Sequence, residues 1–175
     1  MNIFFTNEKL QLLLRKWSIS DINSLLKYAN NKKISDNLTD AFPHPYTIES
    51  AKKFIEFANT NPNSLFFAID FNGEAIGGIG LHQQTDIHRL NAEMGYWLAE
   101  PFWGKGIITN AIKHIIKIGF EQLEINRIFA RPFGRNIASQ KALEKAGFKL
   151  EARLTNTIVK NDILEDELIY AIRKN

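Results

Sequence analysis

The sequence contains no cysteine. This absence excludes disulfides, cysteine-ligated zinc and a reaction that passes through an acyl-cysteine. It also suits a reducing compartment, and we expect a cytoplasmic protein. Residues 1–6 lack the basic segment followed by a longer apolar one that marks a signal peptide. No apolar run approaches the roughly 20 residues of a membrane-spanning helix, so we expect no membrane partner.

Charge of one sign is only slightly in excess. The chain has 22 Lys and Arg against 19 Asp and Glu, a formal net charge of +3. Basic and acidic residues are interspersed and form no dense block, which argues against a nucleic-acid partner. The mild positive balance suits a small polyanionic ligand. The four histidines share no metal-ligand spacing, and we expect no metal site.

The composition is that of an ordinary globular protein, with 45% hydrophobic and 23% charged residues. A chain of 175 residues can bury one sizeable core. No internal repeat, low-complexity segment or linker divides it. We therefore expect a single domain over residues 1–175.

Hydrophobic periodicity predicts a mixed α/β fold, with helices on both faces of one sheet. Strands are expected at residues 10–17, 65–71, 74–84, 91–98, 127–131, 148–158 and 163–172. Helices are expected after the N-caps around Ser18 and at Thr47, and at residues 106–122 and 136–146. The strand, helix and strand between residues 91 and 131 predict a parallel crossover. Three glycines of the third strand, Gly77, Gly78 and Gly80, suggest a bulge or a close approach by another segment.

A glycine-containing turn opens the helix at residues 106–122. The first turn of a helix has unpaired N–H groups and a positive dipole end, which suits an anion. Gly104 and Gly106 remove Cβ atoms that would keep a phosphate from the backbone, and Lys105 and Thr109 add a cation and a hydroxyl. A P-loop would need a glycine at Ala99, and a dinucleotide fingerprint fits poorly. A Gly-rich turn without a ligand is the alternative.

Two spaced motifs carry a family resemblance. The first is Trp103-Gly104-Lys105-Gly106-Ile107-Ile108-Thr109, preceded by Glu93-Met94-Gly95-Tyr96-Trp97-Leu98. The second is Asn136-Ile137-Ala138-Ser139-Gln140-Lys141-Ala142-Leu143-Glu144-Lys145-Ala146-Gly147-Phe148. Together they resemble the coenzyme-binding signature of the GCN5-related N-acetyltransferases. The nearest subgroup is the Rim-type branch, which includes acetyltransferases of ribosomal-protein N-termini. The resemblance covers nearly the whole chain.

The resemblance implies a fold and a coenzyme site. The fold is a mixed, mostly antiparallel sheet of about seven strands with a parallel, splayed pair. Acetyl-CoA is the implied cosubstrate, with its pantetheine arm in the gap of the splayed pair. The implied coenzyme-binding residues are Trp97, Leu98, Trp103, Gly104, Lys105, Gly106, Ile107, Ile108, Thr109, Asn136 and Ser139. Two departures from the family pattern are Ile108, where a small residue is usual, and Leu143, where many relatives carry a tyrosine acid.

The resemblance also implies direct attack by an amine in a ternary complex. Ser139 is the implied proton donor to the leaving thiolate; the alternative is an ordinary first-turn serine. Glu93 is our candidate base, acting through water, and an exposed or cap-bonding carboxylate is the alternative. Phe42 and Tyr46 are candidates to shape the acceptor cleft, although most aromatic residues are simply core.

We therefore expect an enzyme that transfers an acetyl group from acetyl-CoA to a primary amine, with a protein N-terminal α-amine as one such acceptor. A small-molecule acceptor, such as a polyamine, amino acid or aminoglycoside, is the second hypothesis. A non-catalytic acyl-CoA sensor is the third. The chain is expected to be a monomer or a homodimer.

Overall fold

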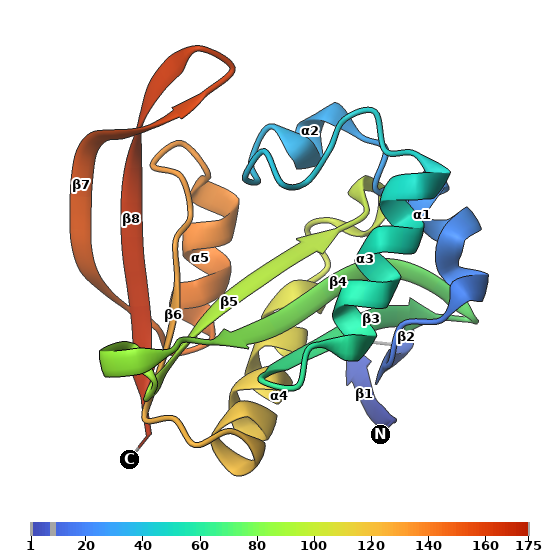
Figure 1. Ribbon diagram of the computed structural model, residues 1–175, viewed down its shortest axis with the longest axis horizontal. Helices are drawn as coiled ribbons and strands as arrows, with labels where there is room; N and C mark the ends of the chain where they lie inside the picture. Colours follow the sequence, from blue (N-terminus) through green and yellow to red (C-terminus); the bar gives the residue numbers. More distant parts are fainter. Residues whose placement is uncertain (1, 8–9, 175) are drawn as a thin grey trace.

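The computed structural model describes residues 2–7 and 10–174 (Figure 1). Met1, part of the segment tested for a signal peptide, lies outside these residues. The helices are α1 (Ile22–Tyr28), α2 (Lys32–Ser35), α3 (Ile48–Thr60), α4 (Ile107–Gln122) and α5 (Ile137–Lys145). The strands are β1 (Ile3–Asn7), β2 (Leu10–Arg15), β3 (Ser64–Phe71), β4 (Glu74–Gln83), β5 (Asn91–Leu98), β6 (Arg127–Ala130), β7 (Lys149–Lys160) and β8 (Ile163–Arg173).

The strands form one sheet in the order β1-β2-β3-β4-β5-β6-β8-β7. Within the described part of the chain only β5 and β6 pair in parallel, so the expected mixed, mostly antiparallel sheet with one parallel pair is confirmed. The described residues contain eight strands instead of about seven, because β1 was missed. Its apolar run of three residues is too short to show a period, and its pairing with β2 defines it as a strand.

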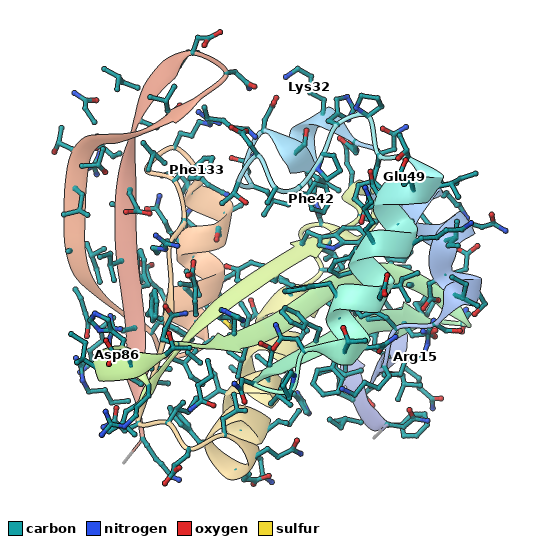
Figure 2. The ribbon with its side chains drawn as sticks, viewed as in Figure 1. Arg15, Lys32, Phe42, Glu49, Asp86 and Phe133 are labelled. Atoms are coloured by element: carbon teal, nitrogen blue, oxygen red, sulfur yellow. The ribbon has the colours of Figure 1, made fainter. Side chains whose placement is uncertain are left out.

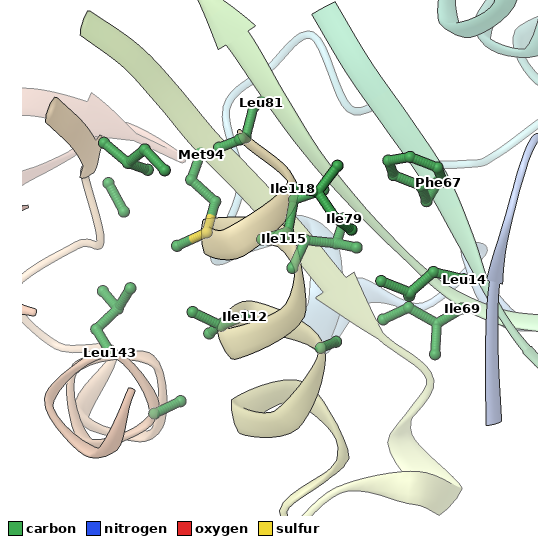
Figure 3. Packing of buried hydrophobic residues seen from close by; sticks show 14 of the residues in the cluster. Leu14, Phe67, Ile69, Ile79, Leu81, Met94, Ile112, Ile115, Ile118 and Leu143 are labelled. Carbon is green, nitrogen blue, oxygen red and sulfur yellow. The ribbon is translucent and has the colours of Figure 1, made fainter. Parts of the chain in front are cut away.

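Two hydrophobic clusters lie on the two faces of the sheet. The larger one packs α4 and α5 against the sheet, with Ile112, Ile115 and Leu143 fully buried (Figure 3). The smaller one holds the apolar face of α3, including Ile55, together with Trp97 of β5. Helices therefore cover both faces, as periodicity predicts, and β5 contributes side chains to both clusters.

The glycines of β4 do allow close approach. A Cβ on Gly77 would lie 2.6 Å from the carbonyl oxygen of Trp97, and one on Gly78 would lie 2.8 Å from the Trp97 indole nitrogen. A Cβ on Gly80 would lie 2.3 Å from the Phe66 ring. The register of the β3–β4 pair shifts between Ile69 and Asp70, where Ile76 of β4 is the extra residue, so the predicted bulge is present in β4. Gly77 and Gly78 thus leave room for Trp97 against β4, and Gly80 leaves room for Phe66.

The parallel pair separates after three residues. Asn91 to Glu93 of β5 pair with Arg127 to Phe129 of β6, and no pairing follows toward Leu98. The Ala99 N–H, directly after β5, donates to the carbonyl of Ile76 in β4. Because backbone groups alternate along a strand, the odd-numbered residues of β5 point their N–H and C=O groups toward β4. The backbone groups of Met94, Tyr96 and Leu98 consequently face the gap between β5 and β6. This gap is where the candidate site lies.

Candidate active site

A cleft of about 1080 Å³ runs through the gap between β5 and β6. Figure 2 places Phe42, on the loop after α2, and Phe133, on the loop before α5, on facing segments at its opening. The structure brings thirteen of the fourteen site residues expected from the sequence to its walls. They are Phe42, Tyr46, Glu93, Trp97, Leu98, Trp103, Gly104, Gly106, Ile107, Ile108, Thr109, Asn136 and Ser139.

The turn before α4 uses the conformational freedom of its two glycines. Gly104 and Gly106 have φ angles of 74° and 72°, in the left-handed region that glycine adopts without strain. Gly106 is the N-cap of α4 and has no side chain that could accept the N–H groups of the first turn. These N–H groups point along the helix axis toward its N-terminus, which borders the cleft. A Cβ on Gly104 would meet no atom within 4 Å. The turn therefore leaves open space beside a helix N-terminus.

Two residues of the turn are held by its own backbone. The indole N–H of Trp103 donates to the Leu98 carbonyl at 2.6 Å, which ties the turn to the end of β5. The Lys105 ammonium donates to the Pro101 carbonyl at 2.9 Å and lies over the Phe102 ring. Lys105 is the one expected site residue that does not line the cleft.

Ile108, the departure from the family pattern in this turn, does not fill the cleft. It is half-buried and packs against the larger hydrophobic cluster, while also contributing to the cleft wall. Its neighbour Ile107 is fully buried in the same cluster. The Ile108 side chain thus packs mainly against the larger hydrophobic cluster and does not block the cleft.

The second motif places Asn136 and Ser139 at the start of α5. Asn136 is the N-cap, and its Oδ1 accepts the Ser139 N–H at 3.2 Å. The Ser139 hydroxyl lies 2.7 Å from the hydroxyl of Tyr96 on β5. Burial raises the pKa of Tyr96 to about 12, with the Ser139 hydrogen bond opposing that shift. The pair therefore joins β5 and α5 with both hydroxyl protons in place at neutral pH.

Glu93 lies at the edge of the cleft in an ion pair with Arg131. Nε and Nη2 of Arg131 donate to the two carboxylate oxygens of Glu93, each at 2.9 Å. The hydrogen bonds to Glu93 raise the pKa of Arg131, and Glu167 lies 3.4 Å from the same guanidinium. This geometry fixes the direction of the Glu93 carboxylate, and each of its oxygens keeps a further lone pair for water.

Aromatic rings form the wall of the cleft opposite α5. Phe42 packs against Tyr46 with ring centroids 5.2 Å apart and against Trp97 at 6.0 Å. Tyr46 is buried, which raises its pKa to about 12. These contacts make the three side chains part of the smaller hydrophobic cluster as well as of the cleft.

Polar contacts connect the loop after α2 with the β7–β8 hairpin. Lys160 lies 2.7 Å from Asp40, and the Asn161 amide donates to Asp36 at 2.9 Å. Arg135 forms an ion pair with Glu165 and donates to the Asp36 carbonyl. Arg135 therefore joins the two sides of the opening in this structure.

A comparison with protein families decides the identity of this arrangement. The model described as "Acetyltransferase (GNAT) domain" matches residues 11–149. The chain belongs to the GNAT acetyltransferase family. The resemblance to this family seen in the two sequence motifs is therefore confirmed.

Individual GNAT relatives agree with the Rim-type branch. The chain is 34% identical over 112 residues to "Putative ribosomal N-acetyltransferase YdaF" of Bacillus subtilis (strain 168), covering 64% of this chain and 61% of that protein. It is 31% identical over 105 residues to the ribosomal-protein-serine acetyltransferase of Escherichia coli (strain K12), covering 60% and 58%. The chain thus spans about three fifths of the length of these two relatives.

A solved GNAT structure matches over almost the full length. The microcin C7 self-immunity acetyltransferase MccE, in complex with acetyl-CoA and AMP, superposes with a TM-score of 0.79 at 25% identity. The match covers 93% of this chain and 92% of that one.

Among residues 2–7 and 10–174 of this chain, no helix is long and apolar enough to cross a membrane. The same residues contain no group of three or more His, Asp or Glu placed to bind a metal.

Sequence reasoning missed Tyr96 in this GNAT site. It stands inside the first motif, but alternation along β5 only marks it as facing the same side as Met94 and Leu98. Nothing in the sequence pairs it with Ser139, 43 residues later. The signal that was available is a hydroxyl-bearing residue in the strand that precedes the phosphate turn.

Proposed function

We propose that this single domain transfers an acetyl group from acetyl-CoA to the α-amine of a protein N-terminus. The observation that carries the proposal is one cleft into which a helix N-terminus, a free backbone edge of β5 and the Ser139 hydroxyl all open. A coenzyme A thioester needs three features: a binding site for its pyrophosphate, an extended groove for its pantetheine arm and a proton donor for its sulfur. The names of the relatives support the acceptor class.

The coenzyme fits the cleft from the turn inward. The first-turn N–H groups of α4 and the open space at Gly104 suit a pyrophosphate, because charge-assisted hydrogen bonds to backbone N–H groups are short and strong. The edge of β5 between Met94 and Leu98 suits the amide groups of pantetheine, which pair as an added strand would. Asn136, at the start of α5, then stands beside the thioester end.

The reaction is a direct acyl transfer. The amine nitrogen bonds to the thioester carbonyl carbon while the Leu98 N–H, which faces the gap, polarises the carbonyl oxygen. The C–S bond then breaks, and the departing sulfur takes a proton from the Ser139 hydroxyl while the serine oxygen regains one from water. Glu93 accepts the amine proton through a water molecule. A coenzyme thiol has a pKa near about 8.5, so its thiolate needs only modest help to leave.

The acceptor argument is one of proton affinity. An α-amine has a pKa of about 8, so roughly a tenth of its molecules are neutral at pH 7. A lysine has a pKa of about 10.4 and is almost wholly charged at that pH. The Glu93 carboxylate, which accepts two hydrogen bonds from Arg131, suits the deprotonation of an α-amine better than that of a lysine, because the α-amine loses its proton more easily. Phe42, Tyr46 and Trp97 would then pack against the first side chains of the acceptor.

An acceptor panel tests the function. We expect peptides with free N-terminal Ser or Ala to be acetylated with a kcat/KM at least about tenfold above that of spermidine or an aminoglycoside, because their α-amine is partly neutral. Coenzyme thiol release gives the rate, and mass spectrometry gives the acetylated position. The matched control is each peptide with a blocked N-terminus and an internal lysine.

Each other outcome points to one of the remaining hypotheses. Preference for small amines would replace the protein acceptor with a small molecule, while the enzyme class would stand. Calorimetric binding of acetyl-CoA without turnover on any amine would leave a sensor and remove the proposed function.

Substitution of the candidate base gives a pH-dependent loss. We expect Glu93→Gln to lower kcat about tenfold at pH 7 and to approach the wild-type rate near pH 9, where the α-amine is already neutral. The measurement is the pH profile of acetylation of a free-N-terminus peptide. Glu167→Gln is the matched control, because Glu167 also pairs with Arg131 but does not line the cleft. An equal loss at every pH would remove Glu93 as the base.

A further inference from the structure

The hydroxyl groups of Tyr96 and Ser139 lie 2.7 Å apart and join two elements that separate within the cleft. Tyr96 comes from β5, at the point where this strand has already parted from β6. Ser139 is in the first turn of α5 and is held there by the Asn136 cap. The hydrogen bond therefore sets the distance between the free edge of β5 and the start of α5.

Either hydroxyl of this pair can donate to the other, and the relative acidity of the two groups decides between them. Each hydroxyl has one proton and two lone pairs. The Tyr96 hydroxyl also lies 3.4 Å from the Ser139 carbonyl oxygen, which can share the Tyr96 proton only as the longer and weaker branch beside the 2.7 Å contact to the Ser139 Oγ. A phenol is a stronger acid than an alcohol, so Tyr96 is the better donor of the two. If Tyr96 donates to the Ser139 Oγ, the Ser139 proton points away from Tyr96 and into the cleft.

We propose that Tyr96 is a positioning residue for Ser139, whose hydroxyl it orients so that the serine proton is presented to the departing sulfur. The inference rests on the proposed role of Ser139 as proton donor. Tyr96 makes no bond to the reacting atoms, and it acts by fixing one of the rotamers of the serine hydroxyl before the thioester is cleaved. The fixed rotamer removes an ordering cost from the transition state.

The single proton of Tyr96 is directed at its neighbour. Burial raises the phenol pKa to about 12, so the phenol keeps its proton at neutral pH and donates it to the Ser139 Oγ 2.7 Å away, not to the sulfur. At position 143, many relatives carry a tyrosine acid. This chain has Leu143 there, which is fully buried and has no hydroxyl. Ser139 thus remains the donor, with Tyr96 behind it.

A double-mutant cycle tests the inference. We expect Tyr96→Phe to lower kcat about tenfold with the KM for acetyl-CoA within about twofold, since one oriented hydrogen bond is lost and the buried ring is kept. In a Ser139→Ala background the same substitution should change kcat by less than about twofold, because there is no serine proton left to orient. Coenzyme thiol release gives kcat and KM, and calorimetry with acetyl-CoA verifies that each variant is folded.

Tyr170→Phe is the matched control for the packing of α5. The Tyr170 hydroxyl donates to Glu144 at 2.8 Å, so it also fastens α5 to a strand, but at the other end of the helix and outside the cleft. We expect this variant to keep the wild-type kcat. An unchanged kcat in Tyr96→Phe, an undiminished loss in the Ser139→Ala background, or an equal loss in Tyr170→Phe would each overturn the positioning role. Full activity of Ser139→Ala alone would instead overturn the role of Ser139 on which the inference rests.

Discussion

Replacement of Ser139 by alanine is expected to lower kcat about 100-fold, with the Kd for acetyl-CoA changed by less than about twofold. A positioned proton donor contributes about two to four orders of magnitude, and a coenzyme thiolate is a tolerable leaving group, which places the effect at the lower end. Binding should persist because the first-turn N–H groups of α4 and the edge of β5 are untouched. Single-turnover kinetics with a free-N-terminus peptide separate the chemical step from product release.

The substitution leaves the local structure intact. The Ser139 N–H still donates to the Asn136 Oδ1, and the Tyr96 hydroxyl keeps the Ser139 carbonyl oxygen as an acceptor. Ser139→Thr is the conservative control, since it retains a hydroxyl, and we expect it to recover at least about a third of the lost activity on a logarithmic scale. A Ser139→Ala enzyme with wild-type kcat would mean that water or another group protonates the sulfur.

The parts of the site that lie close together in sequence were predictable. Two glycines around Lys105 at the start of a strongly apolar helix predict a turn at a helix N-terminus without Cβ atoms, and the structure has this turn immediately before α4. Alternation along β5 places Met94 and Leu98 on one face and Trp97 on the other, as the two clusters confirm. In each case a local rule of backbone geometry carries the prediction.

Pairs brought together by the crossover were not predictable. Tyr96 meets Ser139 and Glu93 meets Arg131 across 43 and 38 residues, and no pattern of one sequence encodes such a contact. The same holds for Lys105, whose ammonium turns back to the Pro101 carbonyl instead of lining the cleft. Side-chain direction depends on the packing of neighbouring segments, which periodicity does not report.

Replacement of Gly104 by alanine is expected to weaken acetyl-CoA binding about 10- to 100-fold. The position has a φ of 74° and open space around the point where a Cβ would stand, on the wall of the cleft beside the N-terminus of α4. A methyl group there would hold a phosphate away from the backbone and remove charge-assisted hydrogen bonds, each contributing about 1.5 to 3 kcal/mol. Calorimetric titration with coenzyme A gives the Kd directly.

Gly73 provides a control with the same backbone and no cleft. Its φ is 84° in the β3–β4 turn, and a Cβ there would also meet no atom within 4 Å. Both alanine variants should therefore lose a similar free energy of unfolding, about 1 to 2 kcal/mol for a left-handed alanine, measurable by denaturant titration. Only Gly104→Ala should lose affinity, because only Gly104 borders the proposed pyrophosphate site. If both variants bound coenzyme A as the wild type does, the phosphates would have to lie elsewhere in the cleft.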